Sequence, residues 1–125
     1  MMKEILIVAL GGSIGAVSRY LICNIASEKF NSIFPYGTFI VNFIGCFIIG
    51  LFMTLITENF SISDYWRLLV TVGFLGGLTT FSSFSYETIK LLQSSQYLFA
   101  FYNIGLNLIL GLLATILGIV TVRYF

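Results

Sequence analysis

Three asparagines stand inside apolar stretches of this chain, and their amides are the groups whose chemistry needs an explanation. Asn42 lies in a run of aliphatic and aromatic residues, and Asn103 and Asn107 lie four residues apart in another. A primary amide offers two N–H donors and a carbonyl acceptor. In apolar surroundings it must bond to another helix or face water. Two roles are therefore possible for these amides. They either bond to another helix or line a path for a small anion, where their N–H groups replace its water.

The spacing places these amides on two helical faces together with other small or polar residues. Thr38, Asn42 and Gly45 follow the i, i+4, i+7 pattern of a single face. The second face carries Asn103, Asn107, Gly111 and Thr115. Two amides one turn apart are harder to explain by interhelical bonding alone, so the second face resembles a polar track.

The segment 73–85 combines glycines and hydroxyl residues, with the sequence GFLGGLTTFSSFS. Gly76-Gly77 followed by Thr79-Thr80 is a poor continuous helix, so a break is expected there. The freed carbonyls then need a cation, water or protein donors, since lipid offers none. A helix that restarts after such a break points its positive dipole end inward.

Phe81 and Phe84 lie three residues apart in the same segment, among Ser82, Ser83 and Ser85. A phenyl ring has a positive edge, so rings presented edge-on among hydroxyl donors suit an anion site. Ordinary packing or lipid contact is the alternative for both rings.

Two charged residues lie at the margins of apolar stretches. Arg19 follows a glycine-rich run, where it either extends to the lipid headgroups or provides a fixed positive charge at the mouth of an anion path. Glu87 lies three residues from Lys90, and a local surface pair is the simplest interpretation of that spacing.

The elements that position these residues are membrane helices. The chain is 58% hydrophobic and only 9% charged, whereas soluble domains carry roughly 25% charged residues. Four stretches reach the length of about 20 apolar residues that a membrane helix needs. They span 5–23, 36–57, 66–92 and 97–122. The sequence thus predicts one all-α membrane domain, and Gly11 and Gly15 with Ser18 form a stripe for close packing on its first helix.

Enzymes and nucleic-acid-binding proteins are excluded as classes. The chain has no histidine and a net charge of +1, and neither Cys23 nor Cys46 has a catalytic or metal-binding spacing. Both cysteines lie in apolar runs, where packing is their expected role.

The distribution of basic residues gives a weak signal for membrane orientation. Lys3, Arg67 and Arg123 fall on the side of the termini, and Lys29, Lys90 and, if it reaches that surface, Arg19 fall on the other. Because orientation follows this bias, a near balance predicts insertion in both orientations and so an antiparallel dimer. One fixed orientation with a weak signal is the alternative. A chain this small needs a partner to cover its polar groups.

Several motifs in chain order resemble those of one family. They are Gly11 to Ala16 with Arg19-Tyr20, Gly37-Thr38, Val41-Asn42, Gly45 to Gly50, Gly73 to Phe84 with Glu87, and Asn103, Asn107 and Gly111. The sequence is similar to the small bacterial fluoride channels, the Fluc or CrcB family, over its whole length. The string Gly-Gly-Leu-Thr-Thr-Phe-Ser is the part of this pattern that is specific to the family.

The resemblance implies a dual-topology, antiparallel dimer in the bacterial inner membrane, with two pores lined by both subunits. Fluoride would enter a vestibule with Arg19 and Glu87, pass Asn42, and move along the edges of Phe81 and Phe84. Thr38, Ser85, Asn103 and Asn107 would line the path, although the two asparagines depart in detail from the family pattern. The backbone carbonyls of Gly76 and Thr79 would hold a structural sodium ion that is not transported.

Two other classes of membrane protein have a similar length or composition. A small dual-topology multidrug exporter has similar length, but such exporters carry a carboxylate in the middle of the first span, where this chain has none. An accessory membrane subunit fits the composition but leaves the asparagine faces unexplained. The partner is either an identical chain or a paralogue of opposite orientation.

Overall fold

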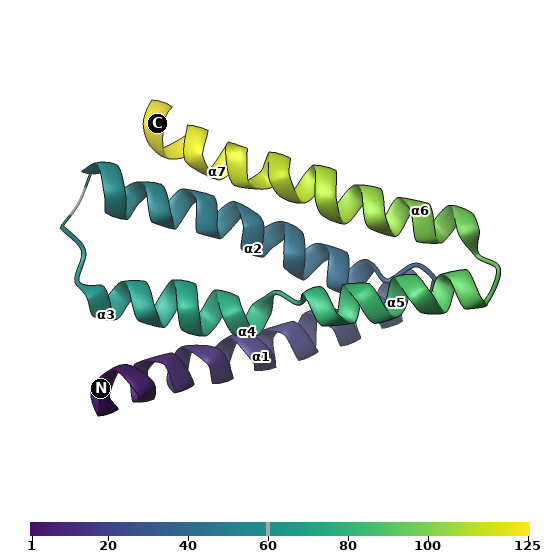
Figure 1. Cartoon of the computed structure of the whole chain (residues 1–125), viewed down its shortest axis with the longest axis horizontal. Helices are drawn as coiled ribbons and strands as arrows, with labels where there is room; N and C mark the ends of the chain where they lie inside the picture. Colours follow the sequence, from purple (N-terminus) through teal and green to yellow (C-terminus); the bar gives the residue numbers. More distant parts are fainter. Residues whose placement is uncertain (60) are drawn as a thin grey trace.

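Four long helical segments run side by side in the computed structural model, which describes residues 1–59 and 61–125 (Figure 1). They span Met2–Phe30, Tyr36–Glu58, Asp64–Gln93 and Tyr97–Tyr124, and each is long and apolar enough to cross a membrane. The predicted all-helical membrane class is therefore confirmed. Neighbouring segments alternate in direction, so both termini lie at one end of the bundle and the connections 31–35 and 94–96 at the other.

Three of the four described segments contain wider, π-helical turns. The first segment is a single helix, α1 (Met2–Phe30), and the second is α2 (Tyr36–Thr54) followed by the π-helical η1 (Leu55–Asn59). The third consists of α3 (Asp64–Arg67), η2 (Leu68–Leu75), α4 (Gly76–Leu78) and α5 (Phe81–Gln93). The fourth consists of α6 (Tyr97–Gly105), η3 (Leu106–Leu110) and α7 (Gly111–Tyr124). Such turns are frequent at functional sites.

Local signals in the sequence set the ends of these segments. Helix α1 continues beyond the apolar run because its next residues are compatible with a helix, and it ends at Asn31, whose φ of 41° is left-handed. Ser63 caps α3, since its hydroxyl accepts a bond from the Tyr65 N–H at 3.3 Å. Pro35 precedes α2, where a missing N–H costs nothing.

Close backbone contact joins α1 to the third segment, as the predicted glycine stripe requires. Gly11 and Gly15 are both buried. A Cβ atom on Gly15 would lie 2.1 Å from the carbonyl oxygen of Phe74, and one on Gly77 would lie 2.5 Å from that of Gly12. Membrane helices associate through such small-residue contacts because lipid provides little hydrophobic driving force between them.

Helix α2 packs between α1 and the fourth segment, and both cysteines lie at these contacts. Both thiols are free; the Sγ of Cys23 faces Gly37, and the Sγ of Cys46 faces Gly111. Both side chains are half-buried at these contacts. Further along, Gly118 lies directly against the α2 backbone at Phe47. These contacts hold the two polar faces of α2 and the fourth segment close together.

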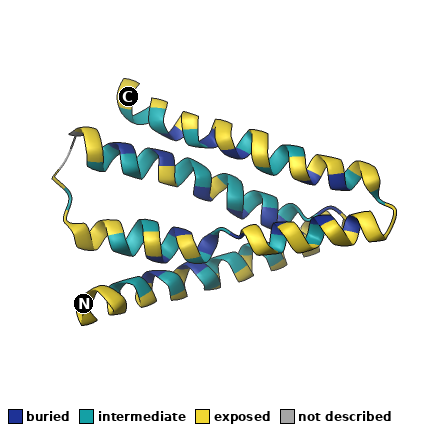
Figure 2. Cartoon of the chain, viewed as in Figure 1, coloured by how far each residue is buried: buried dark blue, intermediate teal, exposed yellow. Residues whose placement is uncertain are grey.

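The distribution of apolar residues is that of a protein dissolved in lipid. Figure 2 shows exposed residues along the outer sides of the helices, and many of them are large and apolar, such as Leu10, Ile109 and Leu112. The small buried core is formed by Val41, Leu75 and Leu78. Because the polar residues Thr38, Thr80 and others are buried beside this core, polarity is concentrated inside the bundle.

Replacing Gly15 by alanine is expected to force α1 away from the third segment, because the new methyl would overlap the Phe74 carbonyl. The melting temperature of the purified protein in detergent should fall. Gly12→Ala is the matched control on the same helix, since its Cβ would meet the Gly73 carbonyl at an ordinary 3.8 Å. Equal melting temperatures for the two variants would contradict this account of the contact.

Candidate functional site

The third segment departs from helical geometry at Thr79 and Thr80, which join α4 to α5 (Figure 1). Both residues have extended backbones, with φ and ψ of −83° and 154° at Thr79 and −151° and 117° at Thr80. Thr80 also caps α5, because its hydroxyl accepts a bond from the Ser83 N–H at 3.1 Å. This joint, defined here as residues 79 and 80, lies near the middle of the segment.

The side chain of Asn42 satisfies the backbone of the joint. Its Oδ1 accepts a bond from the Thr80 N–H at 2.8 Å, and its Nδ2 donates to the Thr80 carbonyl at 3.2 Å. The amide thereby replaces the helical partner of the Thr80 N–H and adds a donor to the Thr80 carbonyl. Of the two interpretations of Asn42, interhelical bonding is the one seen within this chain.

The asparagines of the fourth segment extend this bonding. Asn42 Nδ2 also donates to Oδ1 of Asn107 at 3.0 Å. Asn107 Nδ2 donates to the backbone carbonyl of Asn103 at 2.9 Å and to its Oδ1 at 3.0 Å. Asn103 is fully buried and donates to the hydroxyl of Thr88 at 2.9 Å. The two faces predicted from spacing therefore meet, and the amides form a continuous row.

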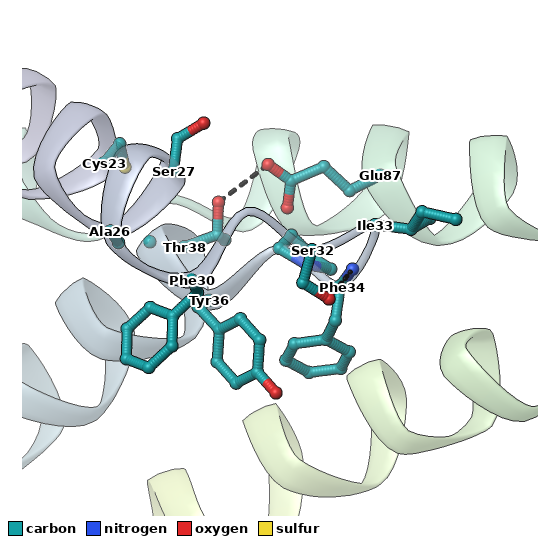
Figure 3. A pocket seen from close by; sticks show the side chains of 12 residues that line it. Cys23, Ala26, Ser27, Phe30, Ser32, Ile33, Phe34, Tyr36, Thr38 and Glu87 are labelled. Carbon is teal, nitrogen blue, oxygen red and sulfur yellow. Dashed lines mark hydrogen bonds between the residues drawn. The ribbon is translucent and has the colours of Figure 1, made fainter.

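A cavity of about 210 Å³ lies at the loop end of the bundle, between the end of α1, the start of α2 and Glu87 (Figure 3). Thr38 donates a 2.7 Å hydrogen bond to Oε1 of Glu87. Oε2 of the same carboxylate is buried and has no hydrogen-bond partner among the described residues. Glu87 does not follow its predicted surface pairing, because Lys90 instead lies over the Tyr86 ring at 5.8 Å.

Arg19 points into the bundle and not to the headgroups. Its guanidinium donates to the Thr79 carbonyl at 3.4 Å, a long contact that brings a positive charge to the joint. The Thr80 N–H, which a continuous helix would direct to the carbonyl of Gly76, is given to Asn42. Gly76 is exposed, with open space around its Cα. Carbonyl oxygens placed in this way are suitable ligands for a hard cation.

A second hollow, of about 450 Å³, opens on the surface beside the joint. Asn42, Asn107, Gly76, Thr79 and both phenylalanines of the motif contribute to its lining. Phe81 is 75% exposed and Phe84 is 9% exposed, and their ring centroids are 5.5 Å apart.

Ser85 lies one turn beyond Phe81 on α5, is exposed, and is not part of the lining of this hollow. The structure thus brings together the predicted site residues except Ser85: Arg19 contacts the joint, and the others line the two hollows or belong to the amide row.

Sequence reasoning missed two partners of this site. The sequence marks Thr80 only as a poor helix former, yet Thr80 caps α5 and is bonded by Asn42; the Thr-x-x-Ser spacing at 80–83 is the available signal for the cap. No spacing in the sequence indicates Thr88, since a buried threonine in a helix usually bonds to its own backbone. It does so here with Phe84, and it also accepts from Asn103.

Over nearly its whole length the chain is similar to proteins of one family. The family described as CrcB-like protein, camphor resistance (CrcB), matches residues 6–119. A protein of Sulfurihydrogenibium sp. named fluoride-specific ion channel FluC is 45% identical over 98% of both chains. Proteins of the same name from Flavobacterium psychrophilum and Chloroflexus aurantiacus are 43% and 46% identical, covering 98% and 99% of this chain and 98% of each relative.

Gly45 is expected to set the position of the joint, because a Cβ there would lie 2.1 Å from the Thr79 methyl. That methyl cannot turn away freely, since the Thr79 hydroxyl donates to the Leu75 carbonyl at 2.8 Å. Gly45→Ala should therefore destabilise the protein by about 1–3 kcal/mol, the usual cost of overpacking. Unfolding in denaturant measures this change.

Adding Thr79→Ser to Gly45→Ala is the control for this prediction. Serine keeps the hydroxyl but removes the methyl that the alanine would meet, so the double variant should recover most of the lost stability. If Thr79→Ser gives no rescue, the contact between Gly45 and Thr79 is not the cause of the destabilisation.

Proposed function

We propose, because the chain belongs to the CrcB family of fluoride channels, that it forms a passive, fluoride-selective channel that exports fluoride from the cytoplasm and thereby confers resistance to it. The protein is accordingly a multi-pass membrane ion channel and not an enzyme. The observation that carries the proposal is a series of site residues inside an apolar bundle. It leads from Glu87 and Thr38 through Asn42 to the two phenylalanines.

The order of these residues along the bundle supports a path for a small anion. Thr38 lines the first cavity and Asn42 lines the second hollow, and they lie one turn of α2, about 6 Å, apart. Arg19 supplies a positive charge near the joint. Fluoride holds its water tightly, so a pore must replace that water with closely placed N–H and O–H donors, and a narrow bore rejects chloride.

The phenylalanines suit the stretch where polar donors become sparse. Phe81 and Phe84 flank the second hollow with their rings inclined at 49°. The edge of an aromatic ring is positive, so ring edges turned into the hollow would attract a small anion. In this proposal Ser85 and Asn107 lie along the same path, and Asn103 lies behind it.

A second, antiparallel copy of the chain completes each pore in this proposal. The hollow beside the joint contains amide and backbone groups, and lipid cannot satisfy such groups. Phe81 and Gly76 are exposed on the same side, so a protein surface there would cover both. The near-balanced basic residues at the two ends favour insertion in both orientations, and therefore an identical partner over a paralogue.

In this proposal a structural sodium ion binds the backbone carbonyls of Gly76 and Thr79. The Gly76 carbonyl has lost its helical partner, the Thr80 N–H, to Asn42, and the Thr79 carbonyl has only a long contact with Arg19. Each subunit would offer these two oxygens, and a hard cation shared by two subunits would receive four. The ion would neutralise the freed carbonyl dipoles and would not be transported.

The direction of transport follows from the membrane potential. In acidic surroundings the neutral acid crosses the lipid and dissociates inside the cell, which traps the anion. A passive channel in the bacterial inner membrane then lets the negative interior drive fluoride out, at about 2.3 kcal/mol per charge for each 100 mV.

Purified protein in liposomes loaded with potassium fluoride is expected to release the ion after addition of an ionophore for potassium, with sodium present on both sides. A fluoride-selective electrode measures the release. Liposomes loaded with chloride should retain it. Fluoride release at the rate of protein-free liposomes would refute the proposed function.

Replacing Phe81 or Phe84 by isoleucine removes the positive ring edge while keeping an apolar side chain, so fluoride release should fall at least about tenfold. The subunits should still assemble, as judged by size-exclusion chromatography. Phe101→Ile is the control, because Phe101 is an exposed phenylalanine of α6 that lies outside both hollows. Unchanged release in both test variants would remove the rings from the path.

A further inference from the structure

A third hollow, of about 370 Å³, lies between the second segment and α7, at the end of the bundle that carries the termini (Figure 1). Ile49 lines both this hollow and the one beside the joint, so the two adjoin. Thr115, the last member of the polar face predicted for the fourth segment, also lines the third hollow. This hollow therefore continues the series of site residues beyond the phenylalanines.

One face of the second segment lines all three hollows. Thr38 lines the first and Asn42 the second. Ile49 follows on the same face, and Thr57 lines the third hollow. From Thr38 to Thr57 the segment rises about 28 Å, close to the roughly 30 Å of hydrocarbon in a membrane. The three hollows together thus extend over the depth of a membrane.

Three threonines contribute hydroxyl groups to the third hollow, namely Thr54, Thr57 and Thr115. Each hydroxyl donates to a backbone carbonyl four residues earlier, at 2.6, 2.9 and 3.2 Å respectively. Because a carbonyl inside a helix also accepts a backbone N–H, such a hydroxyl can turn to an anion without leaving the backbone unsatisfied. Among the described residues that line this hollow, Arg123 is the basic one.

An ion pair between Arg123 of α7 and Glu58 of η1 lies at the outer end of the third hollow. Nε of Arg123 donates to the two carboxylate oxygens at 2.9 and 3.1 Å, and Nη2 also donates to Oε1. The exposed fractions of the two side chains are 54% and 36%. The pair holds the guanidinium at the opening of the hollow, while the carboxylate cancels part of its positive field.

We propose that Arg123 attracts fluoride to the opening of the path at the end of the bundle with the termini, and that Glu58 limits this attraction. The assignment rests on the proposed fluoride channel and extends its path beyond the phenylalanines. A charge at a narrow opening raises the local concentration of the oppositely charged ion, and dissolved salt screens this effect. In an antiparallel dimer each side of the membrane has one such opening, so current in both directions depends on it.

Arg123→Gln and Glu58→Gln test this assignment, because both break the same ion pair but only the first removes the positive charge. The unitary fluoride current is measured in planar bilayers at fixed voltage. In about 0.05 M sodium fluoride, where the screening length is about 14 Å, the current should fall at least about twofold in Arg123→Gln. It should rise by a similar factor in Glu58→Gln.

In about 0.8 M sodium fluoride both variants should conduct nearly like the wild type, because the screening length is then only about 3 Å. An ion pair that merely joins α7 to η1 would instead affect the two variants in the same direction and would not depend on salt. If Arg123→Gln does not assemble, Glu58→Gln still carries the test, since a rise in current requires the free charge of Arg123.

Arg67→Gln is the matched control. Arg67 lies at the same end of the bundle, is partly exposed, and is also near an acidic residue, with Nε 3.8 Å from Oδ1 of Asp64. It is outside the lining of all three hollows. Its replacement should therefore leave the unitary current unchanged at both concentrations.

The outcomes separate this inference from the proposed function. A wild-type protein without fluoride current refutes the channel itself. A wild-type current that falls in both Arg123→Gln and Glu58→Gln, or that neither variant changes in dilute fluoride, refutes the role of Arg123 alone. An equal fall in Arg67→Gln also refutes it, because any positive charge at that surface would then have the same effect.

Discussion

The pairing of the Asn42 amide with the backbone of Thr80 is the interaction on which the site depends. A helix that is interrupted inside a membrane exposes N–H and carbonyl groups that lipid cannot satisfy, at a cost of several kcal/mol each. Asn42 supplies one donor and one acceptor to the same residue, so protein groups satisfy both the N–H and the carbonyl of Thr80. The extended joint, the hollow beside it and the start of α5 follow from this pairing.

Close helix packing makes that pairing possible. A short asparagine side chain reaches a neighbouring backbone only if the helices approach closely, and glycines at the contacts provide this approach. Gly45 receives the Thr79 methyl, Gly15 receives the Phe74 carbonyl, and Gly118 lies on the α2 backbone. Small residues and polar residues therefore act together: the former bring the backbones close, and the latter bond across the short gap that remains.

In the proposed channel the same amides would have two functions that compete for their donors. Within this chain the Nδ2 groups of Asn42 and Asn107 are already bonded, yet both residues line the hollow through which the anion is proposed to pass. An ion at this place would replace an existing acceptor, such as the Thr80 carbonyl at the longer distance of 3.2 Å, and would not have to open a new site.

The sequence by itself determined the membrane class, the four spans and the residues that share a face, because hydropathy and helical periodicity are local properties. It also indicated the family, through the motif at residues 73–84. Only the tertiary structure decided the partners: that Arg19 turns to the Thr79 carbonyl, that Glu87 pairs with Thr38 and not Lys90, and that Thr88 accepts a hydrogen bond from Asn103. These pairs are 60, 49 and 15 residues apart, and spacing within one helix carries no information about which groups on other helices will lie opposite.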